Sequence, residues 1–66
     1  MKIIKRFENR LGYTEVQEHG DCFVCVVKSD FAEISNRTVC KFKPEAMASF
    51  QFHQSWLEKN EKNMPQ

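Results

Sequence analysis

The hydrophobic residues of this chain follow two different periods, and the change between them comes at Pro44. Before Pro44, apolar residues tend to alternate with polar ones, which is typical of β-strands because successive side chains point to opposite faces. After Pro44 they recur every three or four residues, as on one side of an α-helix. The pattern predicts a small sheet followed by one C-terminal helix.

Two stretches before Pro44 predict strands of different kinds. In residues 37–43, Thr38, Cys40 and Phe42 fall on one side and basic residues alternate with them, which predicts a strand with one wet face. Residues 22–27, CFVCVV, are apolar on both sides and predict a central or doubly covered strand. The preceding YTEVQE can pair with it through a hairpin, because Gly20 supplies the backbone angles of a tight turn.

The remaining parts of the sheet region are ambiguous. Asp30 and Glu33 have the spacing of a helix capping box, so residues 28–36 predict either a helical turn or a long hairpin loop. Near the start, apolar residues at every fourth position suit a helix ending at Gly12, whereas Ile3 and Phe7 also suit an edge strand. We favour the strand, because a helix there would leave only a thin three-stranded sheet. The predicted fold is α+β: a three- to four-stranded antiparallel meander with the helix packed on one face.

The helix is the best-defined predicted element. Pro44 is well placed in a first helical turn, where its missing N–H needs no partner, and Glu45 suits the positive end of the helix dipole. No glycine or proline follows up to Lys59. We therefore predict a single domain over residues 1–60 and a flexible polar tail over residues 61–66.

The apolar arc of this helix is wider than one core face requires. At 100° per residue, Phe50 and Leu57 share a stripe with Ala46 and His53, and Met47 flanks that stripe. Ser49, Phe52 and Trp56 continue around the other side, and together with His53 they predict a surface for binding another protein. The alternative is that a strongly curved sheet, or the N-terminal segment, covers the whole arc. Together with the doubly apolar strand, the arc also predicts a homodimer.

Four residues could in principle bind zinc, namely His19, Cys22, Cys25 and Cys40. Cys22 and Cys25 lie in a stretch of strand composition, where residues three apart point to opposite faces. No glycine or proline folds this stretch into a knuckle. We therefore predict no metal and no cofactor, and interpret the cysteines as small buried residues.

The sequence offers little support for an enzyme. A chain of 66 residues has little room for a catalytic cleft, and no nucleophile, base and orienting group occur at a recognisable spacing. The net charge of +1 is low for a nucleic-acid-binding protein. An alternative function is nevertheless a small nucleic-acid-binding regulator, which requires the N-terminal and last strands to be adjacent and to form one basic face from Lys2, Lys5, Arg6, Arg10, Lys41 and Lys43.

Hydropathy and cysteine number indicate the compartment. The start MKIIKRF lacks the apolar core of a signal peptide, and no apolar run approaches the roughly 20 residues of a membrane span. Three cysteines are an odd number for a closed disulfide framework, so we predict a cytoplasmic protein without membrane contact. In size and lack of catalytic motifs the chain resembles the small accessory proteins of phages and mobile elements, many of which bind and inhibit a host protein. The predicted function is binding to another protein, as an accessory protein, inhibitor or regulator.

Overall fold

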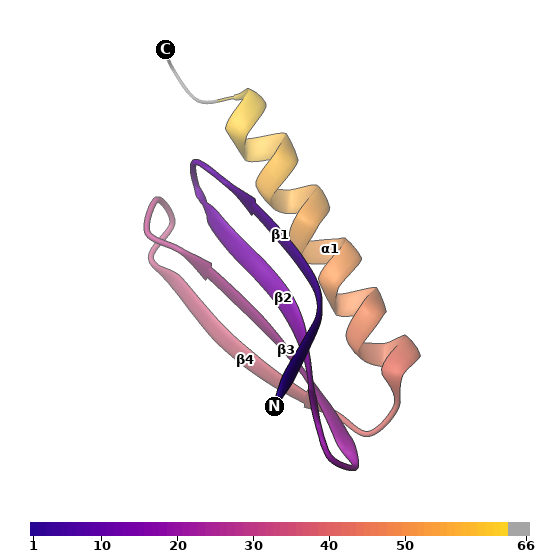
Figure 1. Cartoon of the computed structure of the whole chain (residues 1–66). Helices are drawn as coiled ribbons and strands as arrows, with labels where there is room; N and C mark the ends of the chain where they lie inside the picture. Colours follow the sequence, from indigo (N-terminus) through magenta and orange to yellow (C-terminus); the bar gives the residue numbers. More distant parts are fainter. Residues whose placement is uncertain (64–66) are drawn as a thin grey trace.

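The computed structural model describes residues 1–63 and shows a four-stranded antiparallel sheet with one helix on one face (Figure 1). Each strand lies beside its neighbours in the sequence, in the order β1-β2-β3-β4. The predicted α+β meander is confirmed, and the N-terminal segment is a strand. The elements are β1 (Lys2–Asn9), β2 (Gly12–His19), β3 (Cys22–Ser29), β4 (Ile34–Cys40) and α1 (Lys43–Lys62).

Short turns join the strands. The β2–β3 hairpin turns at Gly20 and Asp21, and Gly20 has a φ of +62°, the left-handed value expected of a tight-turn glycine. Residues 30–33 form a hairpin loop rather than a helical turn, and Glu33 has a positive φ of 54°. As a result β4 begins at Ile34, three residues earlier than the sequence pattern predicts, and ends at Cys40, before the predicted limit.

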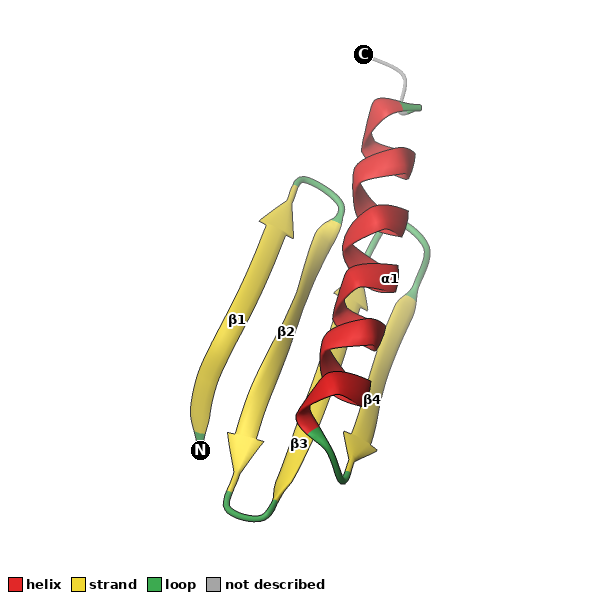
Figure 2. Cartoon of the chain, turned by 90° about the vertical axis from the view of Figure 1, so that its right-hand side faces the viewer, coloured by secondary structure: helices red, strands yellow, loops and turns green. Residues whose placement is uncertain are grey.

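The helix packs mainly across β2 and β3 and leaves the two outer strands less covered (Figure 2). Ala46, Phe50 and Leu57 are its buried residues, whereas Trp56 is half-buried. This is the rotation that the helical spacing predicts. Phe50 and Ala46 join Val16, Cys25 and Cys40 in the core.

The helix continues past the predicted domain boundary at residue 60. It runs through Lys62, and Glu61 accepts a hydrogen bond of 3.0 Å from the backbone N–H of Arg10 in the β1–β2 turn. The guanidinium Nε of Arg10 also lies 3.8 Å from the same carboxylate. These contacts explain why the helical part extends into the predicted tail, of which residues 64–66 lie outside the described residues.

The face of the sheet opposite the helix is less apolar than the two-sided pattern of β3 indicates. Val24 lies on this open face, yet it is only 1% exposed. Its register partners are Gln17 on β2 and Val39 on β4, and Ile3 pairs with Gln17 in the same row. Ile3 and Val39 are the exposed members, so the uncovered apolar surface lies toward the two edges rather than in the middle.

Candidate functional site: an apolar groove beside a free sheet edge

A groove of about 240 Å³ runs between the helix and the β4 side of the sheet. It contains three of the four helix residues predicted to bind a partner, while Ser49 is half-buried and does not line it. Two of its sheet residues belong to a segment that the sequence pattern left as a turn or loop. The β4 groove is lined by Val27, Ile34, Asn36, Phe52, His53 and Trp56.

Phe52 forms the exposed rim of the β4 groove. It is 70% exposed, and its ring packs edge-on against that of His53 with 5.8 Å between centroids. An aromatic side chain left in water forgoes about 1.5–3 kcal/mol of burial free energy, which contact with a partner would recover. Phe52 is therefore available for binding, whereas Phe50, two residues earlier, is part of the core.

Below the rim, His53 meets two polar groups of the sheet. Its Nδ1 lies 3.4 Å from the Thr14 hydroxyl and 3.5 Å from the Cys25 sulfur. The Thr14 hydroxyl also donates a 2.8 Å hydrogen bond to the carbonyl of Val26. With its proton used there, the Thr14 oxygen can only accept from His53 or Cys25. The cluster fixes the His53 ring at the base of the groove.

Burial favours the uncharged form of both partners in the His53–Cys25 contact. Burial raises the pKa of the Cys25 thiol, an effect that the hydrogen bond between Cys25 and Thr14 partly offsets and the nearby Cys40 adds to. Burial also lowers the pKa of His53. Both shifts favour the uncharged thiol and imidazole, whereas a catalytic cysteine needs a lowered pKa and access to substrate. The contacts of this cluster hold the His53 ring against β2 and β3.

The edge of β4 beside the groove carries outward-facing backbone groups. Thr14 reaches the Val26 carbonyl from β2, so the backbone polar groups of Val26 point toward β2. Its register partner on β4, Arg37, then directs its own N–H and C=O away from the sheet. In agreement, the Arg37 N–H donates to the side-chain oxygen of Asn36 at 2.9 Å. Alternation along the strand gives Ser35 and Val39 the same outward orientation.

The opposite edge of the sheet is protected. The pairing of β1 with β2 shifts between Ile3 and Lys5, which is the signature of a bulge. Arg6 forms an ion pair with Glu15, lies 3.6 Å from the Glu8 carboxylate and places its guanidinium 4.4 Å from the Tyr13 ring. Bulges and charged side chains are common protections of strand edges against further pairing.

A polar chain starts at Arg6 on this protected edge and runs along β2 on the open face. Glu15 is only 5% exposed, and its carboxylate accepts from Arg6 and, at 2.6 Å, from the Gln17 amide. The Gln17 oxygen in turn lies 2.8 Å from Nε2 of His19. The buried Glu15 carboxylate on the open face therefore has its hydrogen-bond partners within the chain.

The four residues considered as zinc ligands separate into two pairs. His19 and Cys22 are register partners on the open face, whereas Cys25 and Cys40 face the helix. Within residues 1–63, no group of three or more His, Cys, Asp or Glu side chains could hold one metal ion. All three cysteines are free thiols.

The six basic residues considered for nucleic acid do not form one face. The prediction required β1 and β4 to be adjacent, but they are the two outer strands of the sheet. Arg6 and Arg10 are held in ion pairs, and the Lys5 ammonium lies over the Phe50 ring at 5.2 Å. The Lys41 ammonium lies 5.6 Å from the Phe42 ring in the connection to the helix, and Lys43 is the first residue of α1. The charges are thus dispersed.

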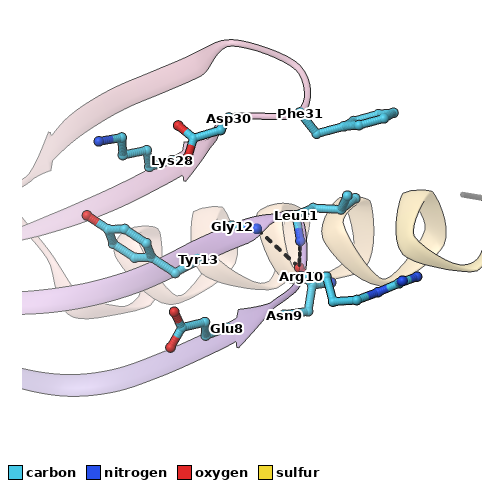
Figure 3. A pocket seen from close by; sticks show the side chains of 9 residues that line it. All are labelled: Glu8, Asn9, Arg10, Leu11, Gly12, Tyr13, Lys28, Asp30 and Phe31. Carbon is cyan, nitrogen blue, oxygen red and sulfur yellow. Dashed lines mark hydrogen bonds between the residues drawn. The ribbon is translucent and has the colours of Figure 1, made fainter.

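A second hollow, of about 320 Å³, lies at the end of the molecule that carries the β1–β2 turn (Figure 3). There the Asn9 side-chain oxygen accepts from the backbone N–H groups of Leu11 and Gly12, and its amide donates to the carbonyl of Leu57 at 3.0 Å. A β-carbon on Gly12 would overlap the Lys28 carbonyl, so only glycine fits here. The hollow has a mixed-charge lining, which makes it a weaker candidate than the β4 groove: Glu8, Asn9, Arg10, Leu11, Gly12, Tyr13, Lys28, Asp30 and Phe31.

No helix within the described residues is long and apolar enough to cross a membrane. In comparisons with known proteins, no family model, no curated protein and no solved structure gives a significant match to this chain. The function therefore has to be inferred from the groove and the edge themselves.

Proposed function

We propose that this chain is a non-enzymatic binding protein that accepts an extended segment of another protein beside β4. The observation that carries the proposal is the position of the β4 groove alongside a strand edge with outward-facing backbone groups. In strand addition, main-chain hydrogen bonds to such an edge supply affinity, and pockets for alternate side chains supply specificity. Phe52 and Trp56 are of the residue types that often contribute most to protein interfaces.

The proposed setting is the cytosol, where the chain would act as an accessory protein, inhibitor or regulator of its partner. Three free cysteines support a reducing compartment. The neutral His53–Cys25 pair and the absence of a metal-binding cluster within residues 1–63 fit a role in binding rather than in chemistry. As an inhibitor or regulator, the chain would act by holding an extended segment of its target beside β4.

A selection from a random library of 12-residue peptides tests this proposal. Peptides enriched on the wild-type chain should bind the Trp56→Ala variant more weakly by about 2 kcal/mol or more, a typical effect at an interface anchor. Nitrogen-15 NMR spectra should show the change at residues 34–40 and along the groove. The backbone N–H groups of Ser35, Arg37 and Val39 should become protected from hydrogen exchange.

Phe52 and Phe31 provide a matched pair for this test. Phe31 is 57% exposed, lies in the β3–β4 loop and does not line the β4 groove. Phe52→Ala should weaken peptide binding and Phe31→Ala should not. The proposal is wrong if no peptide is enriched, or if the enriched peptides bind the Phe52→Ala and Trp56→Ala variants as tightly as the wild type.

A further inference from the structure

β4 carries a single charge, that of Arg37, and the cations that follow it in the sequence have the same sign. Residues 34–44, ISNRTVCKFKP, contain three cationic residues and no Asp or Glu, while Glu33 and Glu45 bound the stretch. Among residues 1–63, ion pairs engage Arg6 and Arg10 on the β1 side, and none involves Arg37. The cation at the middle of the β4 edge is therefore exposed and uncompensated.

The two faces of an added strand would meet different surfaces. Arg37 pairs with Val26 on the open face, so the residue of an added strand opposite Arg37 also lies on that face. The residues before and after it point to the other face, toward Asn36, Thr38 and the β4 groove. One side of the partner strand thus meets a cation, and the other meets an apolar wall with Phe52 and Trp56.

We infer that the partner segment is an acidic β-strand in which apolar residues alternate with Asp or Glu. Its apolar side chains enter the β4 groove, and an acidic side chain lies beside Arg37. This inference rests on the proposed function and adds the chemistry of the partner. Opposite charges placed directly across a strand pair are favourable, whereas like charges in the same place are unfavourable.

The same rule argues against a second copy of this chain as the occupant. Antiparallel pairing of two β4 strands about Arg37 would set Arg37 against its own counterpart. The β1 edge of a second copy carries the cationic Lys2, Lys5 and Arg6 against one acidic residue, Glu8, so its charge is mainly positive as well. A homodimer through β4 would therefore place like charges together, while an acidic segment of another protein neutralises them.

Two synthetic nine-residue peptides test the inference. Both alternate Val, Ile and Phe with a charged residue and carry Pro at each end to prevent self-pairing. One has Glu at every charged position and the other has Lys. The wild-type chain should bind the Glu peptide about tenfold more tightly, because one pairing gains and the other loses a charge interaction of modest size. The preference should reverse in Arg37→Glu and weaken as salt is raised.

Controls separate this inference from the proposed function. Circular dichroism and melting should show that Arg37→Glu folds like the wild type. If both peptides bind equally and the NMR changes map to β4, the acidic-strand inference fails and strand addition stands. If neither peptide binds up to millimolar concentration and the random library also gives nothing, strand addition fails with it. Sedimentation that shows a wild-type dimer, with the NMR changes of dimerisation confined to β4, would overturn the inference in favour of a second copy.

Discussion

The two outer strands of this sheet meet water in different ways. On the β1 side, a bulge interrupts the edge, Arg6 covers the buried Glu15, and Asn9 and Arg10 bond to the end of the helix. On the β4 side the strand is regular, carries one charged side chain and runs beside the β4 groove. The two sides therefore differ in character: contacts that stabilise the fold gather on the β1 side, and the exposed β4 groove lies on the other side.

Neighbouring helix residues test this division most strongly. Leu57 is buried and its carbonyl is bonded by Asn9, whereas Trp56 lines the groove. Leu57→Ala should lower the free energy of unfolding by about 2–5 kcal/mol, the usual cost of truncating a core leucine. Trp56→Ala should cost less than the roughly 3–5 kcal/mol of a fully buried tryptophan. Chemical denaturation measures both. If Trp56→Ala lowers the free energy of unfolding more than Leu57→Ala does, the core lies on the β4 side. The contrast between a stabilising β1 side and a binding β4 side would then be wrong.

The two edge arginines form a matched test. Arg6→Ala should lower the free energy of unfolding by about 2–3 kcal/mol, because the buried Glu15 carboxylate loses its charged donor. Arg37→Ala should change it by less than about 0.5 kcal/mol, as expected for an exposed side chain without such a role. Equal effects in urea denaturation would show that the β1 edge is no more tightly built than the β4 edge.

Asn9 tests the tie between the β1–β2 turn and the helix. Asn9→Ala removes its bonds to the backbone of Leu11, Gly12 and Leu57, and should cost about 1–2 kcal/mol. Hydrogen exchange should become faster in the last turns of α1, around Glu61, while the amides of β4 keep their rates. Faster exchange throughout the sheet would instead show that the Asn9 hydrogen bonds stabilise the whole fold and not only the end of α1.

The smallest expected effect is a pH dependence at the base of the groove. Because burial lowers the pKa of folded His53 below its ordinary value of 6.5, the unfolded chain binds this proton more readily. The buried neutral His53 ring therefore makes its full contribution to the free energy of unfolding above pH 6.5. That contribution is lost as the pH falls through the lower pKa of His53 in the folded state. His53→Asn keeps a polar group but does not titrate, so it should flatten this part of the stability profile between pH 7 and 5. Melting temperatures across that range measure it, with His19→Gln as the control for the second histidine.

Much of the architecture could be read from the sequence because it depends on local pattern. A continuous apolar run identified β3, alternation identified much of β4, and the arc on α1 gave its rotation, with Phe50 and Leu57 inward and Trp56 at the shoulder. The start of β4 was missed because Ser35 and Asn36 have weak strand propensity and read as part of a turn.

Only part of the candidate site could be predicted from the sequence, because the other part depends on tertiary packing. Phe52 and Trp56 could be picked out on one helix, but the sheet walls of the β4 groove depend on how the helix lies over the sheet. The contact between His53 and Cys25 joins residues 28 apart, and no periodicity relates them. Glu15 offered a better signal: had the Arg10–Leu11 turn been recognised, hairpin register would have paired Glu15 with Arg6.

The helix follows all four strands in the chain, and this order matters while the protein is being synthesised. Hairpins between neighbouring strands form in about 1–10 μs, but the 20 residues of α1 take roughly 1–4 s to be made at typical translation rates. During that interval the nascent sheet carries Val16 and Cys25 on a face that has no cover. A sheet that forms without α1 therefore exposes these side chains to water until Phe50 and Leu57 cover them.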